Sequence, residues 1–246
     1  MGSPGTGKSE QLLNIVRYLE QFNIPAYVID LEDKLEAMLL GKDEKPTNLK
    51  QFHIAFDWDK EPKNKDDIGG IKQALDKITK EAKPGNWIMV DRIDLAWSRV
   101  QDWFTQIKNE ETLAELMTKK SVAMKKSSMF IPKFDQGSWQ VINENYGSFI
   151  MNLLYKPRCN VLLTAGIRYD ENSPLDIYGN LGISPKGQKE LAHQPHGVFL
   201  LRVEKTPRKE IKWDITTGKD LPGRDYMERE PLNDFAWEYL SRYYKV

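Results

Sequence analysis

The chain begins with Met1-Gly2-Ser3-Pro4-Gly5-Thr6-Gly7-Lys8-Ser9, the most specific motif in the sequence. From Gly2 to Ser9 it matches the pattern G-x-x-x-x-G-K-[S/T] at every position. Glycines let the backbone curl so that successive N–H groups point at phosphate oxygens, and the start of a helix adds partial positive charge. Apolar residues at near-helical spacing predict that helix from Lys8 to about Gln21. The stretch is therefore a candidate phosphate-binding loop (P-loop); the alternative is a flexible glycine-rich tail.

Short apolar runs further along the chain are typical of buried strands. Three of them are Ile24–Asp30, Trp87–Asp91 and Asn160–Ala165, and helix-like segments lie between them. Strands that alternate with helices predict an α/β fold, with a mostly parallel central sheet and helices on both faces. Gly197–Val203 and Ile211–Thr216 are predicted as late strands that form a C-terminal antiparallel hairpin.

We expect the whole chain, residues 1–246, to form a single domain. Helices are predicted from Ile71 to about Lys83, from Leu95 to about Thr118, from Trp139 to Tyr155 and from Pro231 to Tyr244. Residues 119–137 and 169–196 lack a clear period, so we expect two long loops there. A P-loop normally follows a strand, and only Met1 precedes Gly2. We expect either a truncated chain or another segment in the place of that strand.

Composition narrows the class of protein. The chain has 246 residues, and its 36 Lys and Arg balance its 36 Asp and Glu, so nucleic acid would have to be bound by a local basic patch. One cysteine, Cys159, excludes an intramolecular disulfide framework, and three histidines with that cysteine argue against a zinc site. No apolar run is long enough to span a bilayer, so we expect a cytosolic protein without membrane contact.

Acidic residues at strand ends are the candidate partners of the loop. Lys8 can reach the phosphates, while the Ser9 hydroxyl and the Asp91 carboxylate suit Mg²⁺. Glu32 or Asp30 follows another predicted strand and can orient the water that attacks a terminal phosphate. The plain alternatives are that Asp91 is a turn residue and that the acids near Glu32 cap the next helix.

Four segments resemble parts of RecA-like recombinases. Ala26–Leu35 resembles their strand that ends in a catalytic glutamate within Asp-x-Glu, and Val90–Leu95 is similar to their second acidic motif. Leu163–Arg168 resembles the strand before their second DNA-binding loop, and Ile215–Lys219 the late strand whose basic residues reach a neighbouring subunit's nucleotide. In its length and its Trp139–Tyr155 helix the chain is most similar to the small RecA-like ATPases of bacteriophages, which are implicated in recombination and single-strand annealing.

This resemblance implies roles for further residues. Lys219 or Arg224 would act in trans on the nucleotide of a neighbouring subunit, which requires a ring or filament of identical chains. The alternative is that both are solvated charges near a hairpin turn. RecA-like recombinases usually carry a glutamine that senses the γ-phosphate near position 166; this chain has Thr164 and Gly166 there, so Thr164 is the candidate for a weaker sensor.

Single-stranded DNA is the macromolecular partner that the sequence favours. Lys119–Lys126, followed by Met129, Phe130, Lys133 and Phe134, interleaves cations with apolar groups. Such a segment suits phosphate attraction combined with base stacking. A solvated surface loop is the alternative, and residues 169–196 are a second candidate by position alone.

The sequence therefore predicts a Mg²⁺-dependent ATPase that acts on single-stranded DNA in phage recombination or annealing. The alternatives are another P-loop motor, such as a helicase or a DNA-packaging enzyme, and a nucleotide-switched binding module that hydrolyses little ATP. The expected catalytic residues are Glu32, Lys8, Lys219 and Arg224. The expected nucleotide contacts are Gly2, Ser3, Pro4, Gly5, Thr6, Gly7, Lys8, Ser9 and Thr164, and the expected metal ligands are Ser9 and Asp91.

Overall fold

A computed structural model gives the structure of the protein. It describes residues 1–40, 45–52, 57–64, 67–123, 134–169, 183–188, 191, 194–205, 211–220 and 234–243. In these ranges no helix combines the length and the apolar character that crossing a bilayer requires.

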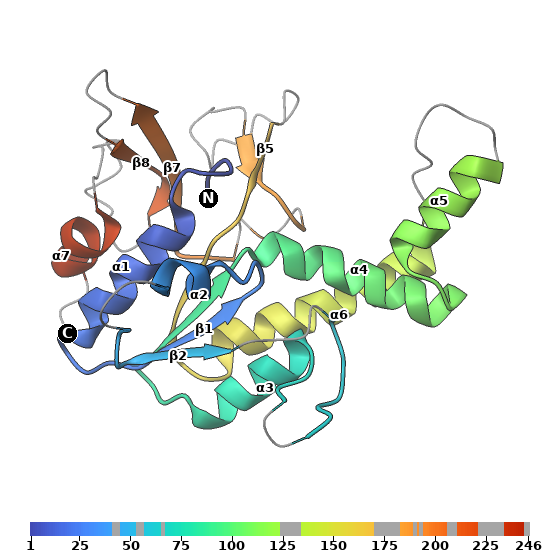
Figure 1. Cartoon of the computed structure of the whole chain (residues 1–246), viewed down its shortest axis with the longest axis horizontal. Coiled ribbons are helices and arrows are strands. Elements are labelled where there is room, and N and C mark those ends of the chain that lie inside the picture. The colour runs from blue at the N-terminus through green and yellow to red at the C-terminus, as the bar shows by residue number, and fades with distance from the viewer. Residues whose placement is uncertain are drawn as a thin grey trace.

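A four-stranded sheet forms the centre of the molecule (Figure 1). Its strands are β1 (Ala26–Asp30), β2 (Leu49–Phe52), β3 (Trp87–Asp91) and β4 (Asn160–Leu163). Their order is β2-β1-β3-β4 and every pairing is parallel, with Asp30 opposite Asp91. All residues of β1 and β3 are buried, as expected for the middle strands of a parallel sheet that is covered on both sides. The predicted α/β fold with a parallel central sheet is confirmed.

Helices cover both faces of this sheet. One face packs against α1 (Lys8–Glu20), α2 (Lys34–Leu39) and the C-terminal π-helix η4 (Phe235–Leu240), which continues into α7 (Ser241–Tyr243). The other face packs against α3 (Ile71–Glu81), α4 (Ile93–Asn109) and α6 (Gln136–Tyr155). Strand residues alternate between the faces because successive side chains of a strand point in opposite directions. Val28 and Met89 accordingly belong to the first core, and Ile29 and Val90 to the second.

The long helix predicted from Leu95 to about Thr118 is two helices, α4 and α5 (Leu113–Ala123). Glu110 ends α4 in a left-handed conformation with φ 58°. Thr112 and Glu115 then form a capping box: the Glu115 N–H donates to the Thr112 hydroxyl (3.2 Å), and the Thr112 N–H donates to the Glu115 carboxylate (2.8 Å). We call α5 with the last turns of α4 (residues 104–123) the arm, because Figure 1 shows it projecting away from the sheet.

Both predicted long loops contain regular structure, so those two predictions were wrong in part. Residues 119–123 belong to α5, and α6 already begins at Gln136. Within the second segment, β6 (Ile183–Pro185) pairs antiparallel with β5 (Ile167–Tyr169). The pair joins segments that are far apart in the chain, and neither three-residue strand is long enough to show a period. Residues 124–133 and 170–182 lie outside the described ranges.

The predicted C-terminal hairpin is confirmed and is longer than expected. Strands β7 (Gly197–Lys205) and β8 (Ile211–Asp220) pair antiparallel, apart from the central sheet. Lys219 therefore lies within β8, opposite Val198, although the predicted strand ended at Thr216. The pairing of β8 with β7 extends past Thr216, where the predicted strand ended, because backbone hydrogen bonds do not require apolar side chains. The structure describes the backbone of Lys219 but not its side chain, and Arg224 is outside the described ranges.

Candidate functional site

The segment Gly2–Gly7 forms a tight loop that leads into α1. Gly7 stands at the amino end of the helix with φ 80°, a left-handed conformation that favours glycine. Gly2 is needed for a different reason, which is space. A Cβ atom at this position would lie 2.4 Å from the Thr6 hydroxyl oxygen and 2.8 Å from the Leu201 carbonyl oxygen. The two glycines of the motif therefore have separate structural causes.

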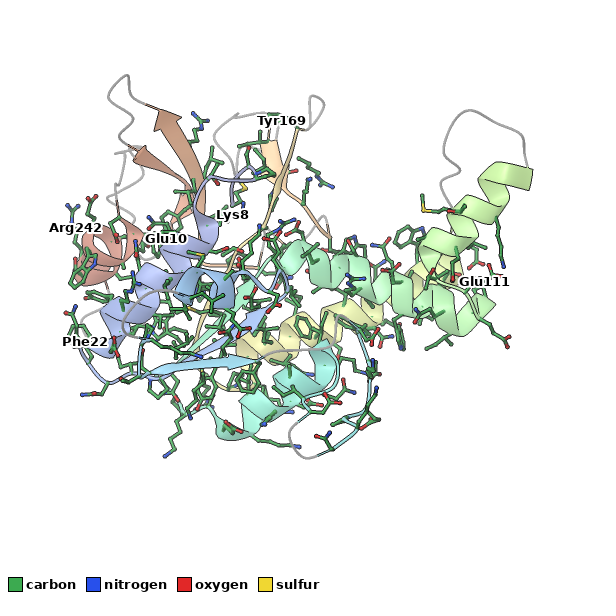
Figure 2. All side chains as sticks on the ribbon, in the orientation of Figure 1. Lys8, Glu10, Phe22, Glu111, Tyr169 and Arg242 are labelled. Atoms are coloured by element: carbon green, nitrogen blue, oxygen red, sulfur yellow. The ribbon has the colours of Figure 1, made fainter. Side chains whose placement is uncertain are left out.

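Lys8 is folded back over this loop. Its ammonium group donates to the carbonyl oxygens of Ser3 (2.8 Å) and Gly2 (3.1 Å). The pKa of Lys8 is lowered, first by burial and then by the charge of Arg92, although nearby acids act in the opposite direction. Figure 2 shows Lys8 at the start of α1, beside β7. The ammonium group thus already lies at the loop whose backbone a phosphate would contact.

Ser9 and Asp91 meet although they are 82 positions apart in the sequence. The Ser9 hydroxyl donates to one Asp91 carboxylate oxygen at 2.7 Å, and the Thr164 hydroxyl donates to the other. Thr164 in turn accepts the backbone N–H of Arg92 at 2.8 Å. The structure therefore brings together Ser9, Asp91 and Thr164, three of the residues proposed from the sequence.

Asp91 is a buried carboxylate. It is 0% exposed, and burial raises its pKa, with Asp30 and Glu32 adding to the rise while the hydrogen bonds from Ser9 and Thr164 oppose it. A cation beside it would relieve the cost of this buried negative charge. The side-chain oxygens of Ser9 and Asp91 are the hard donors that Mg²⁺ prefers.

The number of available ligands also fits Mg²⁺. In the part of the chain that the structure describes, no group of three or more His, Cys, Asp and Glu side chains is arranged to hold a metal ion. Mg²⁺ is usually held by one or two protein ligands together with waters and substrate phosphates, and not by a closed cage of side chains. Ser9 and Asp91 match that mode of binding.

The two acids after β1 have different environments. The buried Asp30 carboxylate accepts the backbone N–H groups of Leu35 (2.8 Å) and Glu32 (3.2 Å), so it shapes the turn into α2. This is the helix-capping role that the sequence left open. The Glu32 side chain is 16% exposed and forms ion pairs with Arg92 and Lys34. Of the two acids, Asp30 binds backbone N–H groups and Glu32 binds charged side chains.

Arg92 and Asp94 belong to the site and were missed in the sequence. The Arg92 guanidinium donates to both Asp94 carboxylate oxygens (2.9 and 2.8 Å) and also to Glu32. Asp94 further accepts the backbone N–H of Gly166 at 3.2 Å. This network (Glu32, Arg92 and Asp94) joins the chain after β1, β3 and β4. Its only sequence signal is an arginine between two aspartates directly after a buried strand, which is too common a pattern to be distinctive.

In the first predicted DNA-contacting segment, Lys119 to Phe134, the residues that are described lie away from the loop. Lys119, on the arm, is exposed and pairs with Glu111 at 2.6 Å. Figure 2 shows Glu111 on the arm, well apart from Lys8. Phe134 packs edge-on against Phe104 and Trp139, so its ring belongs to an aromatic cluster. Lys125, Lys126, Met129, Phe130 and Lys133 lie outside the described residues.

Fold and site together define an α/β protein with a glycine-rich loop and a serine hydrogen-bonded to a buried aspartate at the carboxyl edge of a parallel sheet. When the sequence is compared with known protein families and with characterised proteins, it matches none of them. The function must therefore be argued from the chemistry of the site.

Proposed function

We propose that this chain is a P-loop ATPase of the RecA-like type, which binds ATP with Mg²⁺ at residues Gly2–Ser9. The hydrogen bond between Ser9 and Asp91 carries the proposal. Two hard oxygen donors meet beside a lysine and at the start of a helix, and that combination suits a magnesium-bound polyphosphate. A capping or turn role for Asp91 alone would not require a buried carboxylate with this partner.

Each residue has a separate task in the proposed reaction. Lys8 exchanges its two carbonyl partners for phosphate oxygens, and backbone N–H groups of the loop bind the remaining oxygens. Ser9 and Asp91 hold Mg²⁺, which supplies neutralisation of the phosphate charge. Thr164 fixes the orientation of Asp91 through its hydroxyl. Glu32, whose charge influences the pKa of both Lys8 and Asp91, orients the attacking water.

Single-stranded DNA and a homo-oligomer complete the proposal. The basic segment from Lys119 to Lys133 is the proposed DNA contact, and Lys219 or Arg224 is the proposed group that acts on a neighbouring subunit's nucleotide. Support for these parts comes from the sequence and its resemblance to RecA-like recombinases. If ATP turnover rises when single-stranded DNA is added, DNA binding is coupled to the nucleotide site. Equal turnover with and without DNA would mean that the two are not coupled.

Calorimetric titration with ATP and Mg²⁺ tests the nucleotide site. Lys8→Ala removes the charged partner of the phosphates, and one hydrogen bond to a charged group contributes about 1.5–3 kcal/mol. We therefore expect the affinity to fall roughly 10–150-fold. Lys72→Ala is the matched control, because Lys72 pairs with Asp59 on the other layer of the fold. Equal affinities in the two variants, or no heat from the wild type, would refute the nucleotide site.

A second candidate function is a nucleotide switch with little hydrolysis. The observation that favours it is that Glu32 is held by Arg92 and Lys34, so its carboxylate is already engaged. Glu32→Gln separates the two candidates when phosphate release is measured. For an ATPase we expect unchanged ATP affinity and turnover lowered about 10²–10⁴-fold. For a switch, phosphate release by the wild type and by Glu32→Gln would both stay at background. Asp33→Asn, a substitution at the exposed neighbouring residue, is the control for the change in charge.

A further inference from the structure

Arg92 is a second cation beside the glycine-rich loop. It directly follows Asp91, and its guanidinium donates to Glu32 and to Asp94. After burial, the charge of Arg92 is the largest influence that lowers the pKa of Lys8, whose ammonium group lies at the loop. The two cations are therefore close enough to repel each other, and a bound polyanion would offset that repulsion.

The guanidinium keeps donors that its acidic partners do not use. An arginine side chain has five N–H donors in a planar fork. Asp94 accepts from Nε (2.9 Å) and Nη2 (2.8 Å), and Glu32 accepts from Nη1. Among the described residues these acids take three of the five donors, so one N–H remains on each of Nη1 and Nη2. Two terminal N–H groups suit two oxygens of one phosphate.

Asp94 fixes the guanidinium independently of Glu32. The Asp94 side chain is 6% exposed and also accepts the backbone N–H of Gly166 at 3.2 Å, so its own position is well defined. The Arg92 side chain keeps 16% of its surface exposed, so a ligand at the loop can reach it. The guanidinium is thus held in place and still accessible.

The backbone of Arg92 is also unusual for its residue type. Its φ is 68° and its ψ 60°, a left-handed conformation that costs free energy for any residue with a Cβ atom. Its N–H donates to the Thr164 hydroxyl (2.8 Å), and the Ile93 N–H donates to the Thr164 carbonyl (2.9 Å), so β4 holds the strained turn. Strain of this kind concentrates at functional sites. Here it fixes the point from which the side chain reaches Glu32.

The two carboxylate oxygens of Glu32 have partners of different strength. Oε1 accepts from the largely buried Arg92, while Oε2 pairs at 2.5 Å with Lys34, whose side chain is 57% exposed. An exposed ion pair contributes little, so water can replace Lys34 more easily than Arg92. Glu32 therefore has one oxygen that is held and one that a water molecule can use.

We propose that Arg92 contacts the terminal phosphate of bound ATP and holds Glu32 beside it; this inference rests on the proposed ATPase function. The free N–H groups of Nη1 and Nη2 donate to oxygens of the terminal phosphate, and Nη1 keeps Glu32 Oε1. ADP has no such phosphate, so it makes no contact with Arg92.

In the reaction, Glu32 Oε2 orients the attacking water and takes its proton. The water oxygen bonds to the terminal phosphorus, and the bond from that phosphorus to the bridging oxygen of ADP breaks. The proton then passes from Glu32 to the released phosphate. Arg92 thereby links the presence of a terminal phosphate to the position of the group that activates water.

Calorimetric titration with two nucleotides in the presence of Mg²⁺ tests the phosphate contact. They are ADP and the β,γ-imido analogue of ATP, which is not hydrolysed. Arg92→Lys keeps the charge and loses the planar fork. We expect its affinity for the analogue to fall roughly 10–150-fold, as for one lost hydrogen bond to a charged group, and its affinity for ADP to stay unchanged. The matched control is Arg99→Lys, because Arg99 pairs with Asp102 further along α4, and it should change neither affinity.

ADP serves as the internal control for folding. A variant that binds ADP normally is folded, so a loss confined to the analogue supports the contact. Equal losses for both nucleotides, or no loss for either, would overturn the inference while the nucleotide site stands. A wild type that binds neither nucleotide would overturn the proposed function as well.

A double-mutant cycle tests the link between Arg92 and Glu32. Single-turnover phosphate release is measured for the wild type, Arg92→Lys, Glu32→Gln and the double variant at saturating ATP. If Arg92 acts through Glu32, Arg92→Lys lowers the rate by a smaller factor in the Glu32→Gln background than in the wild type. Equal factors in the two backgrounds, or a wild type without turnover, would remove this positioning role.

Discussion

Asp91 carries a buried negative charge that lowers the stability of the protein when no cation offsets it. Burial raises its pKa in the folded state above the unfolded value of about 3.9. The folded state therefore holds this proton to higher pH, and stability is lost as the pH rises from the unfolded towards the folded pKa. The penalty is fully present above the folded pKa and absent below about pH 4.

Asp91→Asn removes that penalty together with the metal ligand. We expect a higher melting temperature than the wild type at pH 7–8, a difference that shrinks as the pH falls to about 4, and loss of Mg²⁺-dependent ATP binding. Thermal denaturation across this pH range measures the difference in melting temperature. The control is Asp67→Asn, because backbone N–H groups of Lys63 and Gly69 lower the pKa of Asp67 and its loss should not stabilise. A lower melting temperature for Asp91→Asn at pH 8 would contradict the argument.

Arg92 is the cation of the network that connects the segments after β1, β3 and β4. Its side chain is 16% exposed and its partner Asp94 6% exposed, so removing the guanidinium leaves a carboxylate largely out of water. We expect Arg92→Gln to lower the free energy of unfolding by about 2–4 kcal/mol, as for a nearly buried ion pair that loses one partner.

Urea denaturation with a matched variant checks this prediction. Arg99→Gln breaks a more exposed pair with Asp102 on the same helix, with side chains 38% and 31% exposed. We expect that change to cost only about 0–1 kcal/mol. Similar losses in the two variants would mean that the network of Glu32, Arg92 and Asp94 is no stronger than a surface pair.

At the scale of elements, the arm shows how a helix can be missed inside a basic stretch. The sequence Thr112-Leu113-Ala114-Glu115 is a capping-box pattern, and it marks the start of α5. The apolar period instead predicted one helix that continued across this pattern. A left-handed residue at Glu110 and a capped restart at Leu113 separate α4 from α5. The first lysines of the proposed DNA segment thereby sit on a helix that projects from the molecule.

Replacing the five lysines of this segment with serine tests its contact with DNA. They are Lys119, Lys120, Lys125, Lys126 and Lys133. Each lost phosphate contact should reduce the slope of log affinity against log salt by roughly 0.7 for single strands. Fluorescence anisotropy with a labelled oligonucleotide at several salt concentrations gives the slope. The control replaces Lys63, Lys72, Lys77, Lys80 and Lys83, and an equal change there would assign the effect to net charge.

In the molecule as a whole, Met1 and Gly2 lie between the sheet and the hairpin. Met1 and Gly2 make the backbone hydrogen bonds that connect the continuation of β4 with β7. On the same side of the sheet, η4 packs against α1: the Phe235 N–H donates to Gln11, and Asp234 accepts from Asn14.

Features that depend on neighbours along the chain could be predicted from the sequence. Glycine at 7, the apolar strands around Val28 and Met89, and the helical period after Lys8 each encode a local conformation. Even the meeting of Ser9 with Asp91 could be predicted, because the carboxyl ends of parallel strands share one edge. Other features became visible in the folded molecule alone: the partners of Arg92, the pairing of β5 with β6, and the place of Met1 between two strand edges. Those contacts join segments distant in sequence, and which surfaces face each other is settled by packing, not by spacing along the chain.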